Sequence, residues 1–258
     1  MGIKHKPFFR EGNGKCGVLF IHGILGTPNQ FRDFLPLVPE EWTVYNILLD
    51  GHGKTVRDFS ESSLAIWRRQ ADRAAERLCA SCERVIIAAH SMGTLFAIEQ
   101  AIKRPDRVKS LFLLDVPLFP AVKPAAAFTA WKVLFDRISA DDPWGAAARD
   151  CFGMVPDRRL WLYAAWLPRY IELFAQMSIV RDLLPRLAVP TAAFQAGKDE
   201  LVARRATLRL LKAQTAVTTR VLSRSGHFYI EKTDKEILLG AFQKALCGIM
   251  EQKNEGKA

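Results

Sequence analysis

A serine stands where an expected strand gives way to an expected helix, a setting typical of a nucleophile. The run Val85–Ala89 is short, apolar and rich in β-branched residues, as in a strand that is buried on both faces. From Met92 onward apolar residues recur with the period of a helix. Ser91 therefore occupies the position of the serine in a G-x-S-x-G turn, which lifts a hydroxyl group clear of the sheet.

Only small residues fit around such a turn, and the sequence departs from the five-residue pattern at one of them. Ala89 replaces the first glycine, whereas Gly93 is present as the last. A single methyl group is a mild perturbation compared with a larger side chain. By themselves the five residues fit a serine that caps a helix after a buried strand better. The interpretation of Ser91 as a nucleophile therefore depends on partners elsewhere in the chain.

A glycine-rich loop, His22–Pro28, follows another short apolar run. Loops at the carboxyl ends of parallel strands build the binding sites of open α/β sheets. If the serine attacks a carbonyl group, this loop is expected to supply a backbone N–H group for the developing oxyanion, first from Ile24 and next from Leu25. The N–H group of Met92, at the start of its helix, is the second expected donor. The side chain of His22 is expected to shape the loop through hydrogen bonds.

A general base for the serine can be identified by elimination among the five histidines. Three of them precede the serine in the chain (His5, His22 and His52), and His90 adjoins it inside the turn, where it cannot fold back. His227 remains, in the loop after the last expected strand. It is therefore the predicted base.

Two aspartates are candidates for the acid that orients this histidine. Asp199 follows the expected strand Thr191–Ala196 and a glycine. Asp115 also stands at the end of an expected strand, Val108–Leu114, and stays open as an alternative. We favour Asp199, and a comparison of asparagine variants at the two positions would decide between them.

The elements that must position these residues alternate between strands and helices. The further expected strands are residues 42–49 and 218–222. Two helices are expected to begin near Pro28 and at Met92. Three more are expected over residues 60–78, with Ser60 or Ser62 as the cap, 202–211 and 237–250. Residues 7–10 and 16–21 are expected to form a β-hairpin. The alternation predicts a mostly parallel sheet of about seven strands with helices on both faces.

The alternation stops between residues 117 and 187. This stretch contains four of the six tryptophans and many other aromatic residues, some of them at helical spacing. We interpret it as a helical cap inserted into a core made of residues 1–116 and 188–258. Most of its aromatic side chains are expected to form the core of the cap, and some to face a cleft.

Charge and cysteine content narrow the class of protein. The formal net charge is +10, but basic and acidic residues are interspersed and no nucleic-acid-binding motif is present, so nucleic acid is not an expected partner. The most one-sided basic stretch, Arg204–Lys212, is interpreted as an exposed helix face rather than a site for an acidic partner. The five cysteines, without a secretory segment, indicate a reduced, cytoplasmic protein. No uncharged apolar run reaches the roughly 18 residues of a membrane span.

Several short motifs together resemble the α/β-hydrolase superfamily over nearly the whole chain outside the cap. They are His22-Gly23, Asp50-Gly51-His52-Gly53, His90-Ser91-Met92-Gly93, Gly197-Lys198-Asp199-Glu200-Leu201-Val202 and Ser225-Gly226-His227. The order serine, aspartate, histidine is also that of this superfamily. The N-terminal segment with Pro7-Phe8-Phe9 and the segment Ile21–Pro28 resemble the corresponding segments of bacterial carboxylesterases and monoacylglycerol lipases.

The resemblance implies a serine hydrolase that cleaves carboxylic esters of apolar acyl groups, with Ser91, Asp199 and His227 as a catalytic triad. The mechanism requires no metal and no organic cofactor. Leu25, Val202 and Phe228 stand beside the reacting groups in sequence and are expected to contact the substrate.

Two kinds of alternative remain, and the oligomeric state stays open. The same triad serves thioesterases and C–C bond hydrolases, because only the pocket and the leaving group differ. A non-catalytic receptor for small molecules is the alternative from another class, and it would bind a ligand tightly without turnover.

Overall fold

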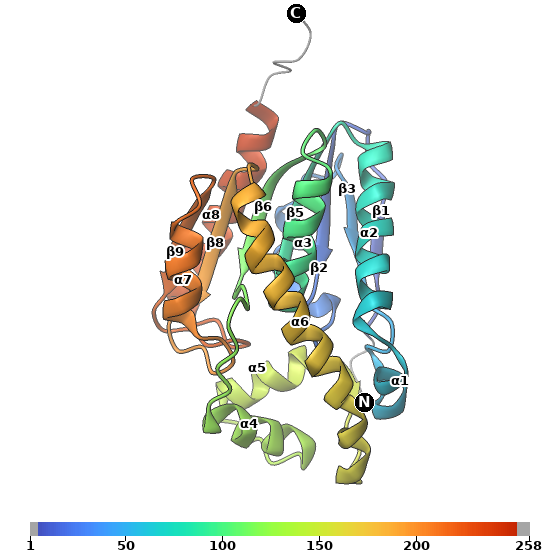
Figure 1. Ribbon diagram of the computed structural model, residues 1–258, viewed down its shortest axis with the longest axis vertical. Helices are drawn as coiled ribbons and strands as arrows, with labels where there is room; N and C mark the ends of the chain where they lie inside the picture. The colour runs from blue at the N-terminus through green and yellow to red at the C-terminus, as the bar shows by residue number, and fades with distance from the viewer. Residues whose placement is uncertain (1–4, 252–258) are drawn as a thin grey trace, which may run out of the picture.

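The computed structural model describes residues 5–251, and its centre is a seven-stranded sheet in the order β1-β3-β2-β5-β6-β8-β9 (Figure 1). The strands are β1 (Phe8–Arg10), β2 (Cys16–Ile21), β3 (Thr43–Asn46), β5 (Arg84–His90), β6 (Val108–Leu114), β8 (Thr191–Ala196) and β9 (Val217–Leu222). All neighbouring pairs are parallel except β1 and β3. The predicted mostly parallel sheet is therefore confirmed. A separate pair, β4 (Lys54–Thr55) and β7 (Met154–Val155), is also parallel.

The predicted hairpin between residues 7–10 and 16–21 is wrong. β1 pairs antiparallel with β3, and Phe9 lies opposite Tyr45. Both sides of β2 are occupied by the parallel strands β3 and β5, so the outer side of β3 is where β1 can join the sheet. The intervening loop contacts the start of β3, where the N–H group of Gly12 donates to Thr43 Oγ1.

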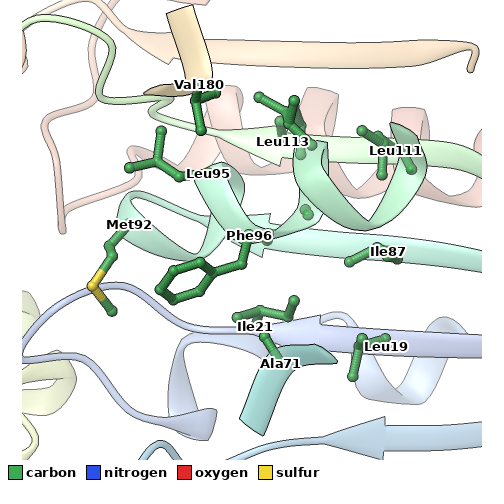
Figure 2. Packing of buried hydrophobic residues seen from close by; sticks show 14 of the residues in the cluster. Leu19, Ile21, Ala71, Ile87, Met92, Leu95, Phe96, Leu111, Leu113 and Val180 are labelled. Atoms are coloured by element: carbon green, nitrogen blue, oxygen red, sulfur yellow. The ribbon is translucent and has the colours of Figure 1, made fainter. Parts of the chain in front are cut away.

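Helices cover both faces of the sheet, and alternate residues of each strand point to opposite faces. On one face α2 (Leu64–Ser81), α3 (Met92–Lys103) and α6 (Leu167–Leu183) pack in one apolar cluster. Figure 2 shows Ile21 and Ile87 of the sheet near Phe96 of α3 in this cluster. On the other face Phe20 and Phe112 pack against α8 (Lys232–Glu251) and the short 3-10 turns η1 (Pro28–Phe31) and η2 (Leu35–Leu37). α7 (Arg204–Lys212) lies beside β9.

The predicted helix 60–78 is two helices. α1 (Val56–Glu61) begins in a capping box in which Thr55 and Asp58 exchange hydrogen bonds. The backbone then becomes extended at Ser62 and Ser63, and the Ser63 hydroxyl caps α2 by accepting from the Ile66 N–H group. The predicted caps, Ser60 and Ser62, are therefore wrong, and serine-rich stretches offer several equivalent caps. The helix expected near Pro28 is the 3-10 turn η1.

Residues 117–187 do not pack as one unit. α4 (Pro124–Leu134) and α5 (Pro143–Cys151) lie beyond the carboxyl ends of the strands, whereas α6 runs back diagonally over the helix layer (Figure 1). Met177 and Val180 of α6 belong to the main apolar core. The expected aromatic core of the cap is also wrong in part, because Trp131 is 48% and Trp161 is 72% exposed. The boundary of the cap at residue 187 stays a prediction, and packing groups the later part of α6 with the sheet.

Across residues 5–251, the helices are all too short or too polar to cross a membrane.

Candidate active site

Ser91 lies in a strained turn between β5 and α3. Its backbone angles are φ 50° and ψ −125°, and residues other than glycine rarely adopt such a positive φ. The flanking space is small: a Cβ atom on Gly93 would lie 2.2 Å from the Ile21 carbonyl oxygen, and one on Gly23 would lie 2.8 Å from Ser91 Cβ. Ala89 fits, fully buried, at the position where the pattern has glycine. The sequence departure at Ala89 is therefore compatible with the turn.

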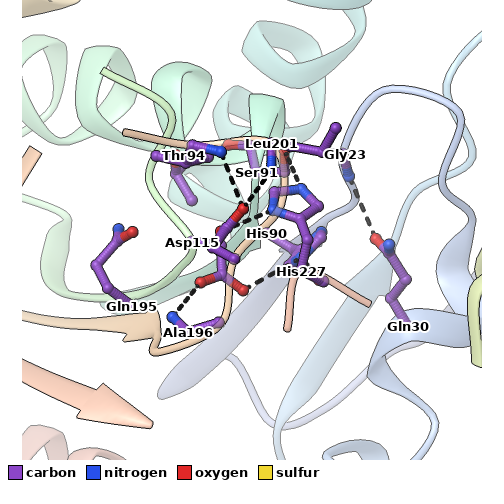
Figure 3. A network of polar contacts seen from close by, with 12 residues as sticks. Gly23, Gln30, His90, Ser91, Thr94, Asp115, Gln195, Ala196, Leu201 and His227 are labelled. Carbon is purple, nitrogen blue, oxygen red and sulfur yellow. Dashed lines mark hydrogen bonds and ion pairs between the residues drawn. The ribbon is translucent and has the colours of Figure 1, made fainter. Parts of the chain in front are cut away.

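A chain of hydrogen bonds joins Ser91, His227 and Asp199. His227 Nε2 lies 3.0 Å from Ser91 Oγ, and His227 Nδ1 lies 3.0 Å from Asp199 Oδ2 (Figure 3 includes Ser91 and His227). The other Asp199 oxygen accepts from the backbone N–H groups of Leu201 and Val202 at 2.8 and 2.9 Å. All three side chains are buried. The loops after β5, β8 and β9 thus bring the three residues together at one edge of the sheet.

The charges of the buried pair stabilise each other. Burial opposes a positive charge on His227, but the charge and hydrogen bond of Asp199, together with the nearby acids Asp115 and Glu200, outweigh burial and raise the pKa of His227 to about 9. Burial also opposes the negative charge on Asp199, yet the charge and hydrogen bond of His227 lower the Asp199 pKa. The imidazole must lose its proton before its Nε2 atom can accept the proton of Ser91.

Asp115, the alternative acid, has a different environment. Its Oδ1 atom accepts from the Ala196 N–H group at 2.6 Å, and its Oδ2 atom lies 3.8 Å from His90 Nε2 (Figure 3). Burial, followed by the charge of Asp199, raises the pKa of Asp115 well above its usual value and so favours the neutral carboxyl group. Of the two acids, Asp199 is the hydrogen-bond partner of His227.

His90 contacts the backbone of the loop that bears His227. Its Nε2 atom lies 3.0 Å from the backbone carbonyl oxygen of His227. Burial lowers the pKa of His90 to about 3, so the ring is neutral and its Nε2–H group donates to this carbonyl. The sequence predicts only that His90 cannot reach the serine. Its place at the same sheet edge as His227 is the signal that could have indicated this contact.

Two neutral histidines hold the glycine-rich loop. His22 Nδ1 donates to the Gly23 carbonyl at 2.8 Å, and its Nε2 atom accepts from the Leu49 N–H group at 3.0 Å. His52 Nε2 accepts from the Leu25 N–H group at 3.1 Å. Burial lowers the pKa of His22 well below its usual value and that of His52 to about 4, which keeps both rings uncharged. His22 has the loop-shaping role expected of it, and sequence reasoning missed that of His52.

The expected oxyanion donors differ in whether their N–H groups already have an acceptor. The Leu25 N–H group is engaged by His52, so it is not free to bind an oxyanion. The Ile24 N–H group has no acceptor within residues 5–251. Met92 is the first residue of α3, so its N–H group has no intrahelical acceptor. Ile24 and Met92 remain the predicted donors.

We expect His52→Leu to destabilise the chain. The substitution leaves the Leu25 N–H group without its acceptor, whereas the Asp50 carbonyl, which lies 3.1 Å from His52 Nδ1, still accepts from Trp67 Nε1 at 2.7 Å. An unsatisfied buried polar group costs about 1–3 kcal/mol. Urea denaturation should therefore show a free energy of unfolding lower by roughly 1–3 kcal/mol. His52→Gln, which keeps an amide donor and acceptor, is the matched control, and equal losses in both variants would contradict the hydrogen-bond explanation.

The residues expected to contact substrate surround the hydrogen-bonded chain to different degrees. Leu25 has a positive φ of 57 and is half-buried against the main core. Val202 is buried and donates to Asp199 through its N–H group. The ring of Phe228 lies edge-on to that of His227, with 5.0 Å between the centroids. Contact of these side chains with a substrate stays a prediction.

A small cavity of about 40 Å³ adjoins His227, and its lining includes His90, Asp115 and Cys151. One nitrogen or oxygen atom from each of His90, Asp115 and His227 lies within 4.8 Å of the others, which is a spacing that a metal ion can bridge. However, both ring nitrogens of His227 already make hydrogen bonds, so a metal would have to displace Ser91 or Asp199. The donors fit the hydrogen-bonded chain better than they fit a metal centre.

Comparisons with known proteins identify a family and relatives of this chain. A family model described as the alpha/beta hydrolase family matches residues 18–238. The thermostable monoacylglycerol lipase of Bacillus sp. (strain H-257) is 29% identical over 201 residues, which cover 76% of this chain and 75% of the lipase. The pimeloyl-[acyl-carrier protein] methyl ester esterase of Neisseria meningitidis is 34% identical over 98 residues, 37% of this chain and 34% of the esterase.

The fold has counterparts among solved structures. One from a study of LipS and LipT, two metagenome-derived lipolytic enzymes, superposes with a TM-score of 0.72 at 20% identity, covering 95% of this chain and 98% of that one. At this identity the likeness concerns the fold alone.

Proposed function

We propose that this chain, which belongs to the alpha/beta hydrolase family, hydrolyses carboxylic esters of apolar acyl groups through Ser91, His227 and Asp199. The observation that carries the proposal is the hydrogen-bonded order Asp199, His227, Ser91, with the serine in a strained turn. A serine hydroxyl at a helix N-terminus, a histidine in hydrogen-bond contact with it and a carboxylate that holds the histidine are what acyl transfer to serine needs.

In the proposed mechanism Ser91 Oγ attacks the ester carbonyl carbon while His227 Nε2 accepts the hydroxyl proton. The negative charge moves to the carbonyl oxygen, where the N–H groups of Ile24 and Met92 stabilise it. His227 then gives the proton to the leaving alcohol as the C–O bond breaks. Water, deprotonated by His227, attacks the acyl-enzyme, and the acid leaves as the proton returns to Ser91.

Apolar side chains around the turn support an apolar acyl group. Ile24, Leu25, Phe119 and Phe152 are half-buried and pack against the core next to the loops that bear the reacting groups. Phe152 is held beside the glycine-rich loop because the next residue, Gly153, donates to the Leu25 carbonyl at 2.7 Å. The monoacylglycerol lipase relative points to the same class of ester. We propose that α4 and α5 form the cap over this region.

An ester presented by a carrier protein is a further candidate substrate. The Neisseria meningitidis relative is named for a methyl ester of an acyl chain on an acyl-carrier protein. Thioesters and C–C bonds remain alternatives for the same three residues, and a receptor without turnover remains the alternative from another class.

The test is mass spectrometry after incubation with a fluorophosphonate, together with initial rates on p-nitrophenyl esters of increasing chain length. We expect one adduct, on Ser91, and turnover that depends on chain length. Preference for thioesters over esters of the same acyl chain would favour the thioesterase alternative. Absence of both an adduct and turnover would refute the proposal and favour a receptor.

Activity should rise with pH through the pKa of His227. The base works only when it is neutral, and Asp199 raises the pKa of His227 to about 9 despite burial. The rate constant kcat/KM should therefore be low at pH 6 and increase tenfold per unit of pH until it levels off near that pKa. A profile of p-nitrophenyl ester hydrolysis, corrected for spontaneous hydrolysis, measures it. A midpoint below 6.5, the usual histidine value, would show that Asp199 does not raise this pKa.

A further inference from the structure

One edge of the molecule carries a run of basic residues without acidic residues among them. Between residues 201 and 230 the sequence contains six basic residues and no acidic residue. The six are Arg204, Arg205, Arg209, Lys212, Arg220 and Arg224. They lie on α7, on the edge strand β9 and in the loop that follows β9. This charge is a large part of the formal net charge of +10.

Three of these residues form a stripe on the outer side of α7, which we name the α7 face. Arg205, Arg209 and Lys212 are exposed, whereas Thr207 and Leu211 are buried. At about 100° per residue, the three cations fall within an arc of about 60°. The α7 face is therefore a compact row of cations that points to solvent.

Among residues 5–251, the cations of this edge have no carboxylate partner, in contrast to other cations on the surface. Lys103, for example, lies 2.7 Å from Asp72, and Arg169 lies 2.7 Å from Glu172. Within the part of the chain that the structure describes, no carboxylate lies within 4.0 Å of any of the six basic side chains between residues 201 and 230. Unpaired charges of one sign produce a field that attracts anionic partners.

The α7 face borders the candidate active site. α7 begins two residues after Val202, whose N–H group binds Asp199, and β9 leads into the loop of His227. In Figure 1, α7 and β9 lie side by side at one end of the sheet, with these loops below them. Two further exposed cations, Lys198 and Arg224, lie in the loops of Asp199 and His227 themselves. A partner bound to the α7 face would lie beside the loops that bear Asp199 and His227.

We infer that the α7 face docks an acidic carrier protein, which presents its acyl chain to Ser91. The inference rests on the proposed function and names the source of its substrate. A row of three cations over about 11 Å of helix matches the spacing of carboxylates on an acidic helix, and complementary charges speed association and orient the partner.

The chemistry of this edge favours a protein over the other polyanions. A membrane surface needs apolar anchors beside the cations, but ten of the exposed large apolar side chains lie between residues 122 and 179. Within the described residues, Val221 is the one such side chain between Arg204 and Arg224. No aromatic residue occurs from Leu201 to His227, so the edge offers no ring on which bases could stack.

The test compares two triple charge reversals. One removes the α7 face (Arg205→Glu, Arg209→Glu, Lys212→Glu). The matched control changes net charge equally at exposed sites elsewhere on the surface (Arg73→Glu, Arg107→Glu, Lys244→Glu). Fluorescence anisotropy measures binding of labelled acyl carrier protein that bears a pimeloyl methyl ester. Hydrolysis of this ester and of a p-nitrophenyl ester is followed in parallel.

We expect the α7 variant to bind the carrier protein about tenfold or more weakly than the wild type at low salt, with the control within about twofold. Raising salt from about 50 to about 500 mM should remove the difference. The p-nitrophenyl ester should be hydrolysed equally by all three proteins. If it is not hydrolysed at all, the proposed function fails, while the binding comparison still tests docking.

Several results would overturn the inference. Equal loss of binding in the α7 variant and the control would mean that only net charge matters. Absence of carrier binding by the wild type would reject an acidic carrier protein as the partner. Tighter binding of the wild type to phosphatidylglycerol vesicles or to short duplex DNA than to the carrier, lost in the α7 variant, would assign the face to a membrane or to nucleic acid.

Discussion

Replacing Ser91 by alanine should abolish hydrolysis of every ester substrate while the chain stays folded. The hydroxyl group is the proposed nucleophile, and His227 Nε2 lies 3.0 Å from it with no other hydroxyl recorded as a partner among the described residues. Loss of a nucleophilic serine costs about 10⁶ in kcat in other serine hydrolases. We therefore expect activity at the limit of detection and no adduct with a fluorophosphonate.

Stability should change little in this variant. Alanine keeps the Cβ atom, so the strain of the positive φ at position 91 is retained rather than relieved. Circular dichroism and thermal unfolding should match those of the wild type within a few degrees. Thr94→Val is the matched control, because Thr94 donates from its hydroxyl to the Ser91 carbonyl at 2.6 Å in the same turn. It should keep more than about a tenth of the activity.

The alanine variant also separates the enzyme from the receptor. Full activity in Ser91→Ala would contradict the mechanism, because alanine lacks the hydroxyl group that the mechanism requires. Tight binding of a small ester by both the wild type and the variant, with turnover by neither, would instead favour a receptor on this fold.

Local patterns were sufficient for the strands and for the residues at their ends. The apolar runs that end at Ala89 and Ala196 predict β5 and β8, because a strand covered on both faces must be apolar throughout. Parallel strands bring their carboxyl ends to one edge, so Ser91, Asp199 and His227 could be expected to meet before any coordinates were known.

Pairing between distant segments could not be predicted in the same way. β1 is only three residues long, and its partner is decided by which sheet edge is free, a property of the whole fold. The hydrogen bonds of His52 and His90 depend equally on tertiary contacts: Leu25 is 27 residues from His52, and His227 is 137 residues from His90. No spacing rule links such pairs.

Asparagine variants of the two acids should have very different effects. Asp199→Asn keeps the shape of the side chain but removes the carboxylate, whose oxygen accepts the hydrogen bond of His227 Nδ1–H. The amide can donate to that nitrogen, which favours the tautomer unable to accept the Ser91 proton, and a comparable change elsewhere lowers kcat about 10⁴-fold. The pKa of His227 should also fall, because Asp199 is what raises it against burial. The acid limb of the pH profile should therefore move to lower pH while the maximal rate collapses.

Asp115→Asn is the matched control, because asparagine has the same shape and its side-chain oxygen can still accept from the Ala196 N–H group. Burial raises the pKa of Asp115 well above its usual value, which favours the neutral form that asparagine mimics. We expect kcat to fall less than about tenfold and the pH midpoint to stay near that of the wild type, since two buried neutral groups of equal hydrogen-bonding capacity differ little in free energy. The reverse ranking, with Asp115→Asn the more damaging, would move the role of the acid to Asp115. Comparable losses in both variants would mean that the two carboxyl groups share one proton and act on His227 as a coupled pair.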